Sequence, residues 1–272
     1  MNRTAARWFS FAFIALLSCS ALGTVTHAQA VSPRPGSMSL WEARRILAPG
    51  TRAHFSFSPD SFQYDSDSKK HLETVRIDLL TAPAVKATCK SACTITDDAG
   101  RSLPRNTGTG KFFEEYGHWY ALNPDGQSAS VCHSDYCRHE AETFAAAFNV
   151  LRTFAQNPDA PLRTFPQRAA AWRALATKPP IPEEVTVQRL MAEDAIKENK
   201  PGEALNYYEN GIELYPTWPE GNFNAALIAA ELKYYSDAIE HMQAYLELVP
   251  NAADAQAARD KILIWQVKSK QK

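Results

Sequence analysis

Apolar and polar residues alternate along several short stretches between residues 51 and 134, for example at 53–57 and 74–79. A period of two is typical of strands that bury one face. Clusters of Asp, Asn, Pro, Ser and Gly separate these stretches and favour turns. We therefore expect an antiparallel β region whose last hairpin has its arms at residues 118–122 and 128–132.

The spacing of apolar residues changes after His139, where they begin to recur every three or four positions. This spacing predicts an amphipathic helix that packs on the β region. The apolar positions are Ala141, Phe144, Ala145, Phe148, Leu151 and Phe154. About seven short strands followed by one such helix resemble the pleckstrin-homology-like (PH-like) barrel, so residues 50–156 are expected to form an antiparallel β domain. A generic antiparallel sheet covered by one helix fits the same order of elements.

Two segments on either side of this region have a different texture. Residues 31–49 begin with a run rich in Pro, Gly and Ser and are expected to be flexible, with a brief helical pattern at Leu40–Leu47. Residues 157–182 contain six prolines and are expected to be a linker with a short helix at 168–175. The linker ends in a stiff, extended Pro-rich run, where we place a domain boundary.

The last third of the chain has helical periodicity in two units, 185–218 and 219–252. In the first helix of the first unit, Leu190, Met191 and Ala195 fall on one apolar face. Helix pairs repeated at such an interval stack into a solenoid. The two units match at a spacing of 34, because Ala204, Tyr208, Gly211 and Pro216 recur as Ala238, Met242, Tyr245 and Pro250.

These residues resemble the tetratricopeptide repeat (TPR), which has a small residue in its first helix, an alanine that opens its second, and a closing proline. Gly211 and Met242 depart from the family pattern, which prefers alanine and an aromatic residue there. The resemblance implies a TPR domain over residues 183–272, with 253–267 as a capping helix. The expected fold class is therefore α+β with two domains, an antiparallel β domain followed by an α-helical solenoid of two repeats.

In the TPR family, the first helix of each repeat lines a concave groove that binds proteins. Some members grip a C-terminal carboxylate there, and Arg189 and Asn224 match that clamp, but Glu193, Asp254 and Ala258 occupy its other positions. An acidic groove repels a carboxylate, so we expect a different kind of protein segment. The groove residues that the resemblance implies are Arg189, Glu193, Lys197, Phe223, Asn224, Leu227 and Glu231.

The first thirty residues have the pattern of a bacterial signal peptide. A positive start at Arg3 and Arg7 precedes an apolar core and small residues that favour cleavage before Val31. Export to the periplasm or beyond is the expectation. The alternative is a lipoprotein, because the residues before Cys19 loosely resemble a lipobox, and membrane contact is expected only if Cys19 is lipidated.

The remaining cysteines are Cys89, Cys93, Cys132 and Cys137. An even number in an exported protein indicates two disulfides; close spacing favours Cys89–Cys93 and Cys132–Cys137, although three connectivities exist. The segment from Cys132 to His139 also holds two thiols and two imidazoles, but its spacing differs from that of a zinc knuckle. We expect a disulfide there, and no metal or other cofactor.

Charge and motifs narrow the class of function. Residues 183–272 carry 9 basic and 15 acidic side chains, which argues against a nucleic-acid partner. The glycine-rich run at 108–111 lacks the pattern of a phosphate loop and is expected to be an ordinary loop.

No catalytic arrangement stands out, so we expect a non-enzymatic protein-interaction scaffold or adaptor in the cell envelope, with self-association as a further use of the helical repeats. The alternative is that the β domain binds a small molecule, lipid or metal, with the repeats used for oligomerisation.

Overall fold

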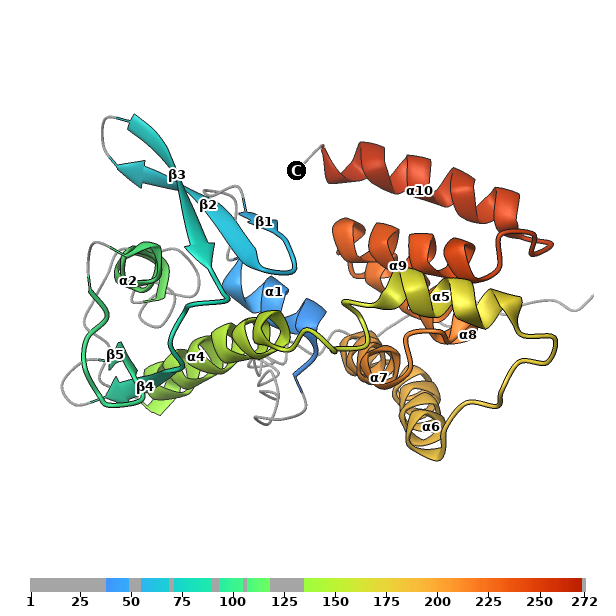
Figure 1. Cartoon of the computed structure of the whole chain (residues 1–272), viewed down its shortest axis with the longest axis horizontal. Helices are drawn as coiled ribbons and strands as arrows, with labels where there is room; N and C mark the ends of the chain where they lie inside the picture. The colour runs from blue at the N-terminus through green and yellow to red at the C-terminus, as the bar shows by residue number, and fades with distance from the viewer. Residues whose placement is uncertain are drawn as a thin grey trace, which may run out of the picture. The chain divides into compact units, whose positions relative to one another are not determined.

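The computed structural model describes residues 38–48, 55–68, 71–89, 93–104, 107–117 and 135–270. The alternating apolar pattern of residues 55–78 forms a three-stranded antiparallel sheet. The sheet order is β1 (Phe55–Phe57), β2 (Ser61–Ser68) and β3 (His71–Asp78) (Figure 1). Phe62 on β2 lies opposite both Phe57 and Ile77, so the apolar positions of neighbouring strands share one buried face.

A second, two-stranded antiparallel sheet joins β4 (Val85–Cys89) and β5 (Cys93–Asp97). Cys89 and Cys93 lie opposite each other at the end of this hairpin and form a disulfide, as the local pairing predicts. The turn expected after β5 is present, and Gly100 there has φ +77°, a conformation that glycine adopts without steric cost. The predicted hairpin at 118–132 and the thiols of Cys132 and Cys137 lie outside the described parts of the chain.

The α+β class is confirmed, but the described strands form two separate small sheets and no closed barrel. The prediction of a loop at residues 108–111 is wrong, because α2 (Gly108–Phe112) is a short helix. This helix runs into the π-helical turn η1 (Phe113–Gly117). Thr107 caps α2 by accepting a hydrogen bond from the Gly110 N–H. A Cβ atom on Gly110 would lie 1.9 Å from the Pro104 carbonyl oxygen, so close packing rather than loop flexibility explains this glycine.

The predicted amphipathic helix is α4 (Asp135–Gln156). Five of its six predicted apolar positions are fully buried, and Phe154 is partly buried. Phe144 stacks on Phe112 at 5.5 Å between ring centroids, and Phe148 meets Phe113 at 4.8 Å. These aromatic contacts form the core between α4, α2 and the sheet.

The helix predicted at Leu40–Leu47 is present as α1, but it is buried rather than part of a flexible segment. Leu40, Trp41 and Leu47 are almost fully buried, and the helix contacts both α4 and α7 (Pro201–Leu214). The described residues between 38 and 270 accordingly belong to one compact unit.

The remainder of the chain is helical, and the helices from α6 to α10 pack in sequence order, each on the next (Figure 1). We call these five helices the helical row. None of the described helices combines the length and apolar character needed to cross a membrane. Besides α7, the helices are α5 (Phe165–Ala174), α6 (Glu183–Lys197), α8 (Pro219–Glu231), α9 (Tyr235–Leu248) and α10 (Ala255–Ser269).

The hairpins α6–α7 and α8–α9 turn in the same way. Asn199 and Lys233, which are 34 positions apart, follow the first helix of each hairpin with φ +58° and +65°. The next N–H reaches back to the fifth residue before it in both cases, from Lys200 to Ala195 (2.9 Å) and from Tyr234 to Ala229 (2.8 Å). This is the hydrogen-bond pattern of a Schellman C-cap.

Side chains on α6 depart from the expected face. Ala192 and Ala195 are buried on a helix that packs on α7, but Leu190 and Met191 are exposed. The small residues mediate the close helix contact, and the larger apolar residues point outward.

Candidate functional site

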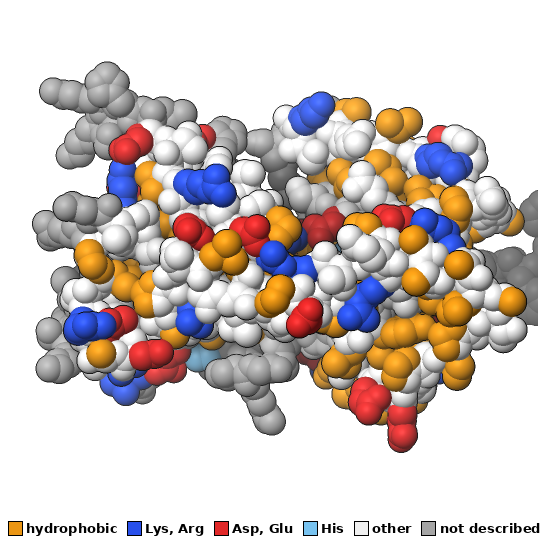
Figure 2. All heavy atoms as spheres, in the orientation of Figure 1, with side chains coloured by type: hydrophobic (Ala, Val, Ile, Leu, Met, Phe, Trp, Pro, Cys, Tyr) orange, Lys and Arg blue, Asp and Glu red, His pale blue; other side chains and the backbone are white. Residues whose placement is uncertain are grey.

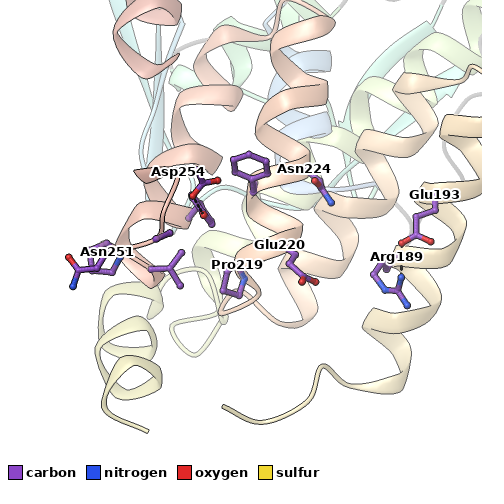
Figure 3. Close-up of a pocket in the computed structure, with 12 residues that line it drawn as sticks. Arg189, Glu193, Pro219, Glu220, Asn224, Asn251 and Asp254 are labelled. Carbon is purple, nitrogen blue, oxygen red and sulfur yellow. Dashed lines mark hydrogen bonds and ion pairs between the residues drawn. The ribbon is translucent and has the colours of Figure 1, made fainter. Parts of the chain in front are cut away.

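A groove of about 800 Å³ runs across the first helices of the two hairpins and the segment after α9. We call it the α8 groove, because α8 contributes its centre. Figure 3 shows Asp254 and Arg189 towards opposite ends of the groove, with Asn224 between them. Its lining includes Arg189, Glu193, Pro219, Glu220, Phe223, Asn224, Tyr245, Val249, Pro250, Asn251, Ala252 and Asp254.

The floor of the groove is aromatic. The Phe223 and Tyr245 rings lie 5.0 Å apart at 59°, a favourable tilted arrangement. The Tyr245 hydroxyl donates to Asp254 Oδ1 at 2.6 Å. Burial and this hydrogen bond raise the pKa of Tyr245 to about 12, so the hydroxyl stays protonated and keeps donating. The carboxylate is thereby fixed at the edge of an apolar surface.

The charged groups of the groove are mostly acidic. Three carboxylates, those of Glu193, Glu220 and Asp254, line it against one cation, Arg189. Arg189 Nη1 pairs with Glu193 Oε1 at 2.6 Å, which leaves a net negative character around Glu220 and Asp254. An aromatic floor with acidic edges favours a ligand that combines an apolar group with a positive charge.

A smaller cavity of about 370 Å³ continues along the same helices. Asn224 lines both cavities, and its Nδ2 donates to the Tyr208 hydroxyl at 3.2 Å. Leu227 and Glu231 line the smaller cavity. Lys197 lines neither of them.

Six of the seven groove residues expected from the sequence therefore line one or other cavity. Sequence reasoning missed Glu220 and Asn251, which lie at the start of α8 and just after α9. Their proximity depends on how the helices stack, and the spacing of residues within one helix does not reveal it. Of the expected clamp positions, Asp254 lines the groove, whereas Ala258 is buried.

A buried polar cluster lies elsewhere, between α1, α7 and α9. Arg45 donates to both carboxylate oxygens of Glu209 at 2.8 and 2.9 Å and to Asp237 at 2.6 Å. His241 Nε2 lies 3.7 Å from Glu209, and its ring packs on Trp41 at 4.4 Å. Burial alone would raise the pKa of Glu209, but Arg45 and His241 outweigh it and lower the value to about 2.

Clusters of perturbed titratable groups occur at active sites, and also in structural ion pairs. The side chains of Glu209 and His241 are completely inaccessible to solvent. A substrate has no direct access to them in this conformation, so the cluster acts as the ionic contact that holds α1 on the helical row.

A third cavity, of about 510 Å³, lies beside α4 and is mainly apolar. Met38, Val150 and Phe154 line it, together with the carboxyl group of Glu213. Glu213 accepts a hydrogen bond from the Leu40 N–H. Burial raises the pKa of this carboxyl to about 7 despite that hydrogen bond.

Among the described residues, no group of three or more His, Cys, Asp or Glu side chains is placed to hold a metal ion. The side chains of residues 132–137, which include both thiols of the cysteine-rich segment, lie outside the described part of the chain. Comparison with protein-family models and with curated protein sequences finds no match for this chain.

Proposed function

We propose that this protein is a non-enzymatic scaffold or adaptor that binds a segment of another protein in the α8 groove. The observation that carries the proposal is the pairing of an aromatic floor, Phe223 and Tyr245, with uncompensated carboxylates at Glu220 and Asp254. Enclosed aromatic side chains contribute much of the affinity of protein interfaces.

In this proposal the helices α6–α10 are a TPR module of two repeats and a capping helix. Support comes from the sequence match at a spacing of 34 residues. It also comes from the matching hydrogen bonds at the two turns, from the Lys200 N–H to the Ala195 carbonyl and from the Tyr234 N–H to the Ala229 carbonyl. Ala204 and Ala238, the corresponding alanines of the second helices, are both fully buried. Two equivalent hairpins are what a repeat of this length produces.

The proposed partner segment carries an apolar side chain next to Lys or Arg. The apolar group packs on Phe223, and the cation lies near Glu220 or Asp254. In this proposal the interaction takes place in the cell envelope, in the periplasm or at a membrane if Cys19 is lipidated, and the signal-peptide pattern of residues 1–30 supports this location.

The proposal is tested by pull-downs from envelope extracts with three forms of the protein: wild type, Phe223→Ala and Glu220→Lys. Asp159→Lys is the control, because it makes the same charge reversal at an exposed position outside the groove. We expect the same partners with wild type and Asp159→Lys, and their loss with both groove variants. Unchanged recovery with correctly folded groove variants would refute the proposal.

The alternative, an apolar small molecule or lipid bound beside α4, is favoured by the cavity of about 510 Å³. Native mass spectrometry of the purified protein tests it. A bound molecule that disappears in a Val150→Phe variant, which fills the cavity, would support this second function. Absence of bound mass after incubation with mixed lipids and fatty acids would argue against it.

A further inference from the structure

The outward side of α6, the first helix of the helical row, carries a small apolar surface. Val187, Leu190 and Met191 are spaced so that they share one side of the helix, and they are between 44 and 52 % exposed. The opposite side of α6 is buried through Val185 and Ala192. We call the exposed residues Val187, Leu190 and Met191 the α6 face.

The last helix of the row has a corresponding surface. Leu263, Ile264 and Val267 are between 53 and 62 % exposed, whereas Ile262 and Trp265 pack inward. We call the three exposed residues the α10 face. Isolated exposed apolar residues are ordinary, but groups at helical spacing on both terminal helices of a stack indicate surfaces that pack on another helix.

The two faces have opposite charged surroundings. Residues 183–198 carry five acidic and two basic side chains, and residues 255–270 carry one acidic and four basic ones. Glu198 is paired with Lys200 at 2.7 Å, so the acidic character of α6 rests mainly on Glu183, Glu184 and Asp194. Figure 2 shows acidic groups beside the hydrophobic side chains at the α6 end of the row, and basic groups around α10.

We propose that the α10 face of one copy packs on the α6 face of a second copy. The apolar residues form the centre of this contact, and the acidic and basic side chains meet around it. Like faces are disfavoured, because an α6–α6 contact brings acids together and an α10–α10 contact brings bases together.

This contact is head to tail, so each copy keeps one unused face. Such an arrangement continues into a chain of copies unless its rotation closes a ring. Each helix has 15 residues and is about 22 Å long, so the contact is small for a specific interface. We therefore expect reversible association that depends on protein concentration. The contact is distinct from the α8 groove, because none of the six residues of the α6 and α10 faces lines that groove.

Sedimentation velocity of the purified full chain at about 5 to 500 µM tests the proposal over the range of a micromolar dissociation constant. We expect the mean sedimentation coefficient to rise with concentration and to rise less in high salt. Leu190→Asp and Leu263→Asp each disrupt one face and should sediment as monomers. Leu80→Asp changes an equally exposed leucine after β3 and should behave as wild type.

Mixing the two disrupted variants gives the decisive result. Leu190→Asp retains an intact α10 face and Leu263→Asp an intact α6 face, so the mixture should form a dimer of one copy of each. A wild-type protein that stays monomeric at every concentration would overturn the proposal. So would association of either variant alone at the wild-type level, or a mixture that remains monomeric.

Discussion

Glycines beside Trp218 show how closely single residues are packed in the helical row. Trp218 is buried against Tyr208, with ring centroids 5.7 Å apart. A Cβ atom on Gly221 would lie 2.1 Å from the Trp218 ring, and one on Gly211 would lie 2.9 Å from it. The resemblance to the repeat family marked Gly211 as a departure, and the indole that fills the space of a side chain explains it.

Gly221→Ala should therefore destabilise the fold, although alanine is the better helix former. Overpacking costs about 1–3 kcal/mol, and the gain in helix propensity is at most about 1 kcal/mol. Gly202→Ala is the matched control, because no atom lies within 4 Å of its Cβ position. Urea unfolding should show a lower free energy of unfolding for Gly221→Ala and an equal or higher one for Gly202→Ala. Equal stability of both variants would contradict the packing around Trp218.

The carboxyl group of Glu213 links stability to pH. Its pKa rises from 4.5 to about 7 on folding, mainly through burial, so the folded state holds a proton that the unfolded state releases. The stabilisation is complete below pH 4.5 and is lost as the pH rises through about 7. Between pH 5 and 8 this group should lower the free energy of unfolding by up to about 3 kcal/mol.

Glu213→Gln should make the fall in stability between pH 5 and 8 smaller, because glutamine does not titrate and still accepts the Leu40 N–H bond. Chemical unfolding at several pH values measures the difference. Glu203→Gln, on the exposed side of the same helix, is the control and should keep the wild-type profile. A Glu213→Gln profile identical to wild type would mean that this carboxyl is ionised in the fold at neutral pH.

At the scale of elements, periodicity predicted helices well, because the apolar stripe of a helix is a local pattern. α4 and the two hairpins of the helical row lie close to their predicted ranges. The sequence did not predict the small helix α2, because Gly108 and Gly110 have low helix propensity. The presence of these two glycines is explained only by their close packing against the backbone of Arg76 and Pro104. The exposure of Leu190 was missed too, because periodicity identifies an apolar face without showing what covers it.

The turns of the two hairpins give an element-scale prediction. Lys233 adopts φ +65°, which costs a side-chain-bearing residue about 1 kcal/mol or more, whereas glycine avoids this cost. Lys233→Gly should raise the free energy of unfolding by about 0.5–1 kcal/mol. Asn199→Gly, at the corresponding turn, should raise it less, because asparagine tolerates this conformation. Thermal unfolding of both variants tests whether Lys233→Gly stabilises the protein more than Asn199→Gly does. A melting temperature of Lys233→Gly below that of wild type would contradict the prediction.

At the scale of the whole molecule, the contact between α1 and the helical row was beyond the reach of sequence patterns. Arg45 and Glu209 are 164 positions apart, and each resembles an ordinary solvated charge when its own helix is considered alone. This pair fully buries the carboxylate of Glu209 against α1, although the sequence predicted that α1 belongs to a flexible segment. Removing one partner of such a pair costs about 3–5 kcal/mol, so this contact contributes strongly to holding α1 in place.

The candidate groove was partly predictable because α6 and α8 are the first helices of two hairpins that turn in the same way. Arg189 and Phe223 occupy corresponding places 34 residues apart, and both line the groove. Glu220 and Asn251 come from helix ends and the segment after α9, whose positions depend on stacking. The same stacking leaves the α6 and α10 faces uncovered, so the helical row carries both the proposed groove and the proposed self-association surfaces.

The most direct test of the proposed groove is a selection of random displayed peptides on the immobilised protein, followed by affinity measurement with wild type and Phe223→Ala. We expect selected peptides to combine an apolar residue with Lys or Arg. They should bind the variant at least about tenfold more weakly, the effect of losing an aromatic hot spot. Peptides that bind both forms equally, or that are selected for acidic residues or a free C-terminal carboxylate, would contradict the account.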